Sequence, residues 1–139
     1  MLTQQTKHFA GVKPTSKVGV IGIGGLGHMA LKSLNKWGYE VVAFSSSPDK
    51  KDQILAMGAT KVINSKDPNE LVSIKSSLDF ILNTTNVTLD WNFYLTTLAP
   101  KGRFHTVGVV LEPMVIPAFS LIIGEKSVAG SPPGSPALT

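Results

Sequence analysis

The glycine-rich segment from Gly22 to Gly27 constrains this sequence more than any other feature, because it fits the pattern G-x-G-x-x-G. An apolar run from Lys17 to Ile23 precedes the glycines and predicts a β-strand. From Leu26 to Trp37, apolar residues follow at helical spacing. A strand, a glycine turn and a helix in this order predict the first unit of an α/β sheet.

Each glycine in the pattern has a physical task in a turn that meets an anion. Gly22 permits the tight turn, Gly24 lets a pyrophosphate approach the backbone because it lacks a Cβ, and Gly27 lets the helix pack closely on the strand. The N–H groups and the dipole of the helix start favour negative charge. We therefore predict nucleotide binding at Gly22, Gly24, Gly25, Leu26 and Gly27. The alternative is a glycine turn kept for packing only.

The rest of the chain alternates between short apolar runs and segments of helical period. Further strands are expected at residues 40–44, 61–64, 78–83, 103–107 and 126–130. Helices are expected at residues 48–57 (with Ser47 as N-cap), 68–75, 89–98 and 118–124, and a turn at 100–102. This alternation predicts an α/β fold: a doubly wound parallel sheet (Rossmann fold) of about six strands with helices on both faces. The length of 139 residues fits one dinucleotide-binding domain, 1–139.

Composition and charge exclude several classes of protein. The formal net charge is +4, no basic run exceeds two residues and aromatic residues are sparse, so we expect no nucleic-acid partner. The apolar runs are too short for a membrane span and the first residues lack a signal-peptide core, so we expect a cytoplasmic protein without membrane contact. The absence of cysteine excludes disulfides, thiolate metal sites and cysteine nucleophiles within this sequence.

The end of the expected second strand carries serines where dinucleotide-binding folds often carry an acid. An Asp or Glu about 20 residues after the glycines binds the ribose 2′-hydroxyl of NAD. Here Ser45, Ser46 and Ser47 occupy that stretch, and Lys50 follows. Hydroxyls and a lysine can bind a 2′-phosphate that a carboxylate would repel, so we predict that Ser45, Ser46 and Lys50 bind NADP, with NAD disfavoured. Ser47 is expected to cap a helix, and Asp49 would serve an NAD ribose if the register slipped.

Four segments of the chain, taken together, match one known family. They are KVGVIGIGGLGHMALK from Lys17, SSSPDKK from Ser45, Met57-Gly58-Ala59 followed by Lys61-Val62-Ile63-Asn64, and the stretch from Gly130 to Ser135. The sequence resembles zinc-type medium-chain alcohol dehydrogenases, in particular the cinnamyl alcohol dehydrogenase-like branch. The resemblance extends from His8 to Ser135. It implies NADP dependence and hydride transfer between a nicotinamide cofactor and an alcohol or aldehyde.

The resemblance also implies cofactor-binding positions beyond the glycines and serines, namely Thr84, Val107, Gly108, Val109 and Ser131. Thr84 matches the edge of the cofactor cleft, the stretch from Val107 to Val109 lies near the nicotinamide, and backbone groups around Ser131 face the carboxamide. The sequence departs from the family at Asn83, where Asp is common, and at Pro132-Pro133, which offer no N–H.

The family holds its catalytic zinc with two cysteines and a histidine in a separate domain. This chain has no cysteine, and His8, His28 and His105 lack ligand-like spacing. We therefore assign no metal ligand and no catalytic residue here. We expect a cofactor-binding domain whose zinc-bearing catalytic domain belongs to the same longer polypeptide, and which alone does not transfer hydride. The family pairs two subunits through the strand matching Lys126 to Gly130, which implies a homodimer.

Two other functions are compatible with the same fold. One is a non-catalytic nucleotide-sensing module. The other is a methyltransferase that uses S-adenosylmethionine, which the serines disfavour because that cofactor's ribose calls for an acid after the second strand. A cysteine-bearing zinc domain upstream in the natural gene would favour the oxidoreductase over the sensor.

Overall fold

The computed structural model describes residues 16–22, 24–108 and 110–132. The strands of this part are β1 (Lys17–Ile21), β2 (Glu40–Ser45), β3 (Lys61–Asn64), β4 (Leu78–Asn83), β5 (Leu98–Thr106) and β6 (Ser127–Gly130). The helices are α2 (Gly25–Lys36), α3 (Lys51–Ala56), α4 (Pro68–Ser73), α5 (Trp91–Thr96) and α6 (Ala118–Ile122), and a 3-10 helix, η1 (Pro48–Lys50), precedes α3. None of the helices in these ranges has the length and apolar character that a membrane crossing requires.

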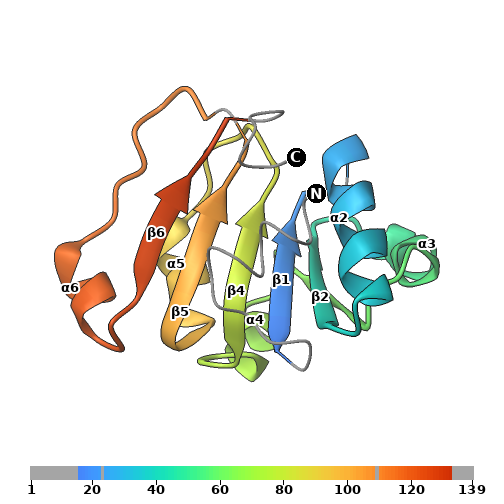
Figure 1. Cartoon of the computed structure of the whole chain (residues 1–139), viewed down its shortest axis with the longest axis horizontal. Helices are drawn as coiled ribbons and strands as arrows, with labels where there is room; N and C mark the ends of the chain where they lie inside the picture. Colours follow the sequence, from blue (N-terminus) through green and yellow to red (C-terminus); the bar gives the residue numbers. More distant parts are fainter. Residues whose placement is uncertain (1–15, 23, 109, 133–139) are drawn as a thin grey trace.

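The six strands form one parallel sheet in the order β3-β2-β1-β4-β5-β6 (Figure 1). From β1 the chain winds outward through β2 to β3, and then returns to the other side of β1 with β4. The strand order therefore reverses between β1 and β4, which is the point where doubly wound sheets bind ligands. This topology confirms the predicted Rossmann fold.

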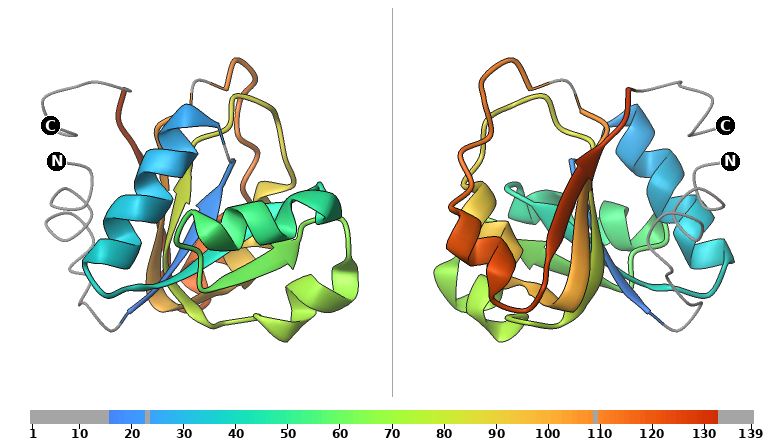
Figure 2. Two further views of the ribbon diagram at one scale, coloured as in Figure 1. Left: turned by 90° about the vertical axis from the view of Figure 1, so that its right-hand side faces the viewer. Right: turned by 60° about the vertical axis from the view of Figure 1, so that its left-hand side comes forward.

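Helices cover both faces of the sheet (Figure 2). Each face has its own apolar core. On one face, Leu31 of α2 and Ile54 of α3 pack with residues of β1, β2, β3 and β4. On the other face, Leu71 of α4 and Leu95 of α5 pack in the second core, with α6 against it. Strands between two such layers must be apolar on both sides, which is what the sequence pattern indicated.

Helix starts differ from the sequence predictions at two places. Ser47 occupies the predicted N-cap position ahead of Pro48, but its side chain makes no capping hydrogen bond, and the segment begins as the 3-10 helix η1 before α3 continues it. The expected helix at 89–98 begins only at Trp91, because Asp90 caps it and accepts a hydrogen bond from the N–H of Phe93 at 3.2 Å.

Trp37 and the turn at residues 100–102 also differ from expectation. Trp37 was expected on the apolar face of its helix, but it is the C-cap of α2 and 50% of its surface is exposed. Residues 100–102 lie inside β5, where the pairing with β4 shifts register between Leu78 and Phe80. Lys101 has φ 65° there, so the turn residues form an irregularity within a strand and do not end it.

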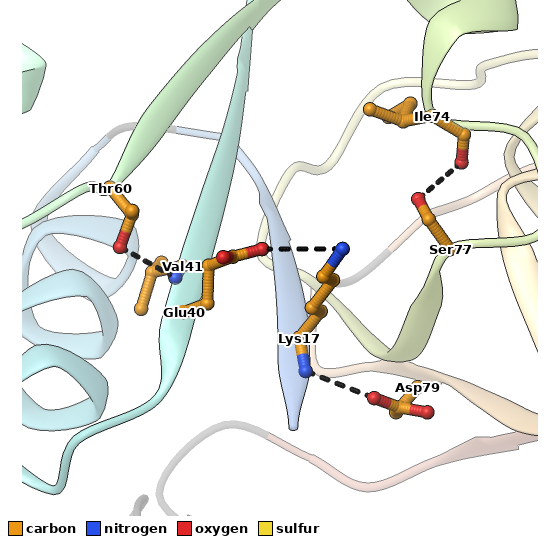
Figure 3. Close-up of polar contacts among 7 residues, drawn as sticks. All are labelled: Lys17, Glu40, Val41, Thr60, Ile74, Ser77 and Asp79. Atoms are coloured by element: carbon orange, nitrogen blue, oxygen red, sulfur yellow. Dashed lines mark hydrogen bonds and ion pairs between the residues drawn. The ribbon is translucent and has the colours of Figure 1, made fainter. Parts of the chain in front are cut away.

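Polar contacts fasten the strands at the amino edge of the sheet (Figure 3). The N–H of Lys17 donates to Asp79 Oδ2 at 3.0 Å, and Lys17 Nζ lies 3.7 Å from Glu40 Oε2. The N–H of Val41 donates to Thr60 Oγ1 at 3.0 Å. These contacts tie β1, β2 and β4 at the edge opposite their carboxyl ends.

Candidate functional site

The carboxyl ends of five neighbouring strands lie level with one another. Strand pairing aligns one row of residues across the sheet: Phe44, Ile21, Asn83, Thr106 and Gly130. Backbone hydrogen bonds continue one residue beyond it, from the N–H of Thr84 to Ile21 O (2.9 Å), of Val107 to Asn83 O (2.9 Å) and of Ser131 to Thr106 O (3.1 Å). The next row therefore consists of Ser45, Gly22, Thr84, Val107 and Ser131. Every member of this row is a residue that the sequence analysis assigned to the cofactor.

The turn after β1 needs two of its glycines for reasons internal to the protein. Gly22 has φ +90°, and a Cβ there would lie 2.7 Å from Thr84 Oγ1. A Cβ at Gly27 would lie 1.9 Å from the carbonyl oxygen of Gly22. These contacts agree with the predicted tasks of a tight turn and a close approach of helix to strand. A Cβ at Gly24, in contrast, would meet no atom within 4 Å, so space is open beside this glycine.

The first turn of α2 presents backbone N–H groups without a side chain that caps them. Gly24 is the N-cap and has no side-chain capping bond, and the first turn contains no acidic residue. The first helical hydrogen bond runs from the N–H of His28 to the carbonyl of Gly24 at 2.8 Å. The main-chain N–H groups of Gly25 and Leu26 thus belong to the open end of a 12-residue helix, where the helix dipole favours an anion.

A cleft of about 350 Å³ lies beside Gly22, between the ends of β1, β2 and β3 and Tyr94 of α5. Its lining combines polar and apolar side chains: Ile21, Gly22, Phe44, Ser45, Ser46, Ser47, Lys50, Ser65, Thr85, Val87, Leu89 and Tyr94. The cleft brings together Gly22, Ser45, Ser46 and Lys50, which the sequence analysis had assigned separately. None of these described lining residues is acidic.

The serines after β2 differ in what they contact. Ser45 Oγ accepts a hydrogen bond from the N–H of Ser47 at 3.1 Å, which closes a local turn. The carbonyl of Ser45 accepts from the N–H of Ser65 at 2.9 Å, so this turn is joined to the chain leaving β3. Ser46 is exposed within the cleft lining. The turn therefore holds one hydroxyl in place and presents another to solvent.

Tyr94 and Ser65 line the cleft but were not among the predicted residues. The ring of Tyr94 packs edge-on against Phe44, with centroids 5.1 Å apart and planes at 87°. The pKa of the Tyr94 hydroxyl is raised, chiefly by burial; a hydrogen bond with Ser65 acts to lower it, and the negative charge of Asp90 acts to raise it. Ser65 follows β3 directly, so its place at the carboxyl edge could have been predicted from the expected strand. Nothing in the sequence around Tyr94 indicated that this residue of α5 would reach the cleft.

The residues Thr84, Val107 and Gly108, which follow β4 and β5, contact the backbone and the core and do not line the cleft. Thr84 Oγ1 donates to the carbonyls of Ile21 at 2.8 Å and Gly22 at 2.9 Å, and Thr85, its neighbour, is the threonine that lines the cleft. The side chain of Val107 is 1% exposed and packs in the core on the α2 face, so it does not face the cleft. A Cβ at Gly108 would lie 1.9 Å from the carbonyl oxygen of Thr85.

Two further predicted positions lie apart from the 350 Å³ cleft. Ser131 lies at the far end of the row, after β6, and its hydroxyl contacts His105. Val109 lies outside the described residues. In the described ranges, no group of three or more His, Asp or Glu side chains could hold a metal ion.

Comparison with known proteins identifies the family to which this arrangement of residues is similar. The model of the family described as zinc-binding dehydrogenase matches residues 25–138. The aldehyde reductase AdhA of Synechocystis is 52% identical over 126 residues, which are 91% of this chain and 38% of that protein. The chain thus spans little more than a third of the length of this relative.

Solved structures agree with the sequence relationship. The cinnamyl alcohol dehydrogenase SbCAD4 of Sorghum bicolor superposes with a TM-score of 0.90 at 35% identity, over 96% of this chain and 38% of its own. The cinnamyl alcohol dehydrogenase of Helicobacter pylori, solved in complex with NADP(H), superposes with a TM-score of 0.79 at 32% identity, over 94% of this chain and 37% of its own. The resemblance to cinnamyl alcohol dehydrogenases drawn from the motifs is thereby confirmed.

Proposed function

This chain belongs to the zinc-binding dehydrogenase family, and from that premise we propose that it is the NADP(H)-binding domain of an alcohol dehydrogenase or aldehyde reductase. When bound, the nicotinamide of such a cofactor gives or accepts a hydride. The residues of this chain would bind and orient it. One observation carries the proposal: Gly22 of the glycine turn, the serines after β2 and Lys50 line a single cleft at the carboxyl edge of the sheet.

The pyrophosphate of a dinucleotide fits the open space at the start of α2. Gly24 has no atom within 4 Å of the place where a Cβ would be, so a ligand can approach its backbone closely. The uncapped N–H groups of Gly25 and Leu26 would donate to the phosphate oxygens. Gly22 and Gly27 would contribute by shaping the turn that exposes these groups.

A preference for NADP over NAD follows from the charge of the cleft. Ser45, Ser46 and Lys50 are polar groups that line the cleft after β2, and none of the described lining residues is an acid that would repel a 2′-phosphate. Asp49, the acid that could serve an NAD ribose, is exposed on η1 and is not part of the cleft lining. The Helicobacter relative solved with NADP(H) is consistent with this preference.

Catalysis would require the remainder of a longer polypeptide. The relatives are between two and three times as long as the part they share with this chain. In the family's pattern, cysteines and a histidine of a separate domain bind the zinc, and this chain contains no cysteine. We propose that the zinc domain polarises the alcohol or aldehyde oxygen and that the present residues hold the cofactor beside it.

The edge strand β6 would join two such subunits. It forms one end of the six-stranded sheet, and the outer side of an edge strand offers unpaired backbone groups to a second chain. A mass measurement at high protein concentration tests this homodimer. A monomeric mass would refute the pairing without affecting the cofactor proposal.

Calorimetric titration with NADPH and with NADH tests the cofactor proposal directly. We expect NADPH to bind at least about tenfold more tightly, because the 2′-phosphate gains charge-assisted contacts with Lys50 and the serines. Equal or tighter binding of NADH would refute the NADP preference. Binding of neither cofactor would refute the cofactor site itself.

A further inference from the structure

Ser131, the first residue after β6, is held to β5 by two hydrogen bonds. Its N–H donates to the carbonyl of Thr106 at 3.1 Å, and its Oγ lies 2.9 Å from His105 Nε2. The backbone bond continues the ladder between β5 and β6, while the side-chain bond adds a second point of attachment. Together they define the position of the half-buried Ser131 relative to the sheet.

The imidazole of His105 is a rigid partner for this bond. It is 6% exposed, and its backbone lies in β5 between Leu82 of β4 and Ala129 of β6. The ring stacks on Phe80, with centroids 6.1 Å apart and planes at 22°. Burial and the contact with Phe80 restrict where this ring can place Nε2, so the ring can hold the Ser131 hydroxyl at a defined position.

The described residues around the end of β6 give the Ser131 contact its importance. β6 has four residues, all half-buried or exposed, and it lies at the edge of the sheet. Pro132 comes next and has no N–H with which to continue the ladder. Within the described residues, which end at Pro132, the contact from His105 lies at the last hydrogen-bonded position between this strand and its neighbour.

We propose that His105 is a positioning residue for the nicotinamide half of the cofactor and that it acts through Ser131; this inference rests on the proposed function. A doubly wound sheet binds one nucleotide on each of its two halves, which meet where the strand order reverses. Ser45 and Lys50 belong to the half formed by β1, β2 and β3, so they face the adenosine. Ser131 ends the other half, in the same row of the sheet as Ser45 and Gly22.

The test compares two ligands on the same variants. NADPH occupies both halves, whereas adenosine 2′,5′-bisphosphate contains only the adenosine and its phosphates. For His105→Phe, which keeps a ring on Phe80, and for Ser131→Ala we expect the Kd for NADPH to rise about fivefold, as for the loss of one hydrogen bond. The Kd for the bisphosphate should stay within about twofold. The double variant should be no weaker than either single variant.

Two further variants separate positioning from a general effect on the fold. Ser127→Ala removes the hydroxyl that accepts from Arg103 Nε at 3.2 Å, at the other end of the same strand, and should leave both affinities unchanged. His105→Gln, whose amide can replace Nε2, should restore most of the NADPH affinity. If His105→Phe does not fold, Ser131→Ala still decides, because it removes one half-buried hydroxyl.

The outcomes separate this inference from the proposed function. Wild-type protein that binds both ligands, with variants that lose affinity only for NADPH, supports the inference. Equal losses for both ligands, or no loss in either variant, would overturn it and leave the cofactor site intact. Wild-type protein that binds neither ligand would overturn both proposals.

Discussion

The hydroxyl of Thr84 lies 2.9 Å from the carbonyl oxygen of Gly22, to which it donates a hydrogen bond, and it also reaches the carbonyl of Ile21 at 2.8 Å. The first residue after β4 thus fastens the turn after β1. These two strands are the neighbours between which the strand order reverses. The conformation of the glycine turn therefore depends on a side chain about 60 residues away in the sequence.

Replacing Thr84 with valine should lower stability and weaken NADPH binding together. The change keeps the side-chain shape but leaves the carbonyls of Ile21 and Gly22 without this donor, so we expect unfolding to become easier by about 1–2 kcal/mol. Denaturant unfolding and NADPH titration measure the two effects. Thr88→Val is the control, because Thr88 is exposed and its hydroxyl donates to Glu112 Oε2 at 3.3 Å instead of to the glycine turn. Unchanged stability in Thr84→Val would contradict the role assigned to this hydroxyl.

Alanine at Gly24 and at Gly27 should have different consequences. At Gly27 the new Cβ would lie 1.9 Å from the carbonyl oxygen of Gly22, so α2 must move and we expect a loss of about 1–3 kcal/mol in stability. At Gly24 the new Cβ meets nothing within 4 Å, so stability should be kept while NADPH binding weakens. Thermal unfolding and titration of both variants check this. A Gly24→Ala variant that binds NADPH normally would argue against pyrophosphate contact there.

Lys50→Ala should weaken NADPH binding about fivefold and leave NADH binding nearly unchanged. Lys50 lines the cleft and is exposed, so its charge contributes modestly and its effect should shrink as salt is added. Lys51→Ala is a matched control, since Lys51 is the adjacent exposed lysine and does not line the cleft. Similar losses in both variants would indicate a general effect of charge and not a contact with the 2′-phosphate.

Ser46→Asp should reverse the cofactor preference. A carboxylate at this exposed position of the cleft would repel a 2′-phosphate and could accept a hydrogen bond from a ribose 2′-hydroxyl. We expect the Kd for NADPH to rise at least about tenfold while the Kd for NADH falls or stays the same. Ser46→Asn adds a side chain of similar size without the charge. If it reduces NADPH binding equally, the effect is steric and the electrostatic argument is wrong.

Acid should destabilise the wild-type protein relative to His105→Gln. Burial, and then the positive charge of Arg103, lower the pKa of His105 below its usual value. The unfolded chain therefore binds a proton more readily than the folded one. The free energy of unfolding falls as the pH drops below about 6.5 and stops falling below the folded-state pKa. Urea unfolding of both proteins between pH 5 and about 8 measures this difference. A stability difference that is constant over this range would show that His105 does not titrate as described.

The sequence alone determined the local elements and the family. The first strand, the turn and α2 could be predicted because an apolar run, a group of glycines and a segment of helical period follow one another directly. Backbone freedom and periodicity depend only on residues that are close together in the sequence. The serines after β2 and the absence of an acid there are likewise visible without a structure. Side-chain capping was less predictable. Ser47 had the right residue type for a cap, yet its N–H bonds to Ser45 and its side chain does not cap.

Only the tertiary structure decided which of these residues meet. The order of the strands brings Gly22, Ser45 and Lys50 to one cleft and adds Tyr94 from a distant helix, whereas Val107 from the same row turns into the core. The hydrogen bond between His105 and Ser131 likewise depends on β5 and β6 being paired in one register. Strand pairing and register are set by contacts between segments far apart in the chain. The periodicity of one segment does not show which other segment will lie beside it in the sheet.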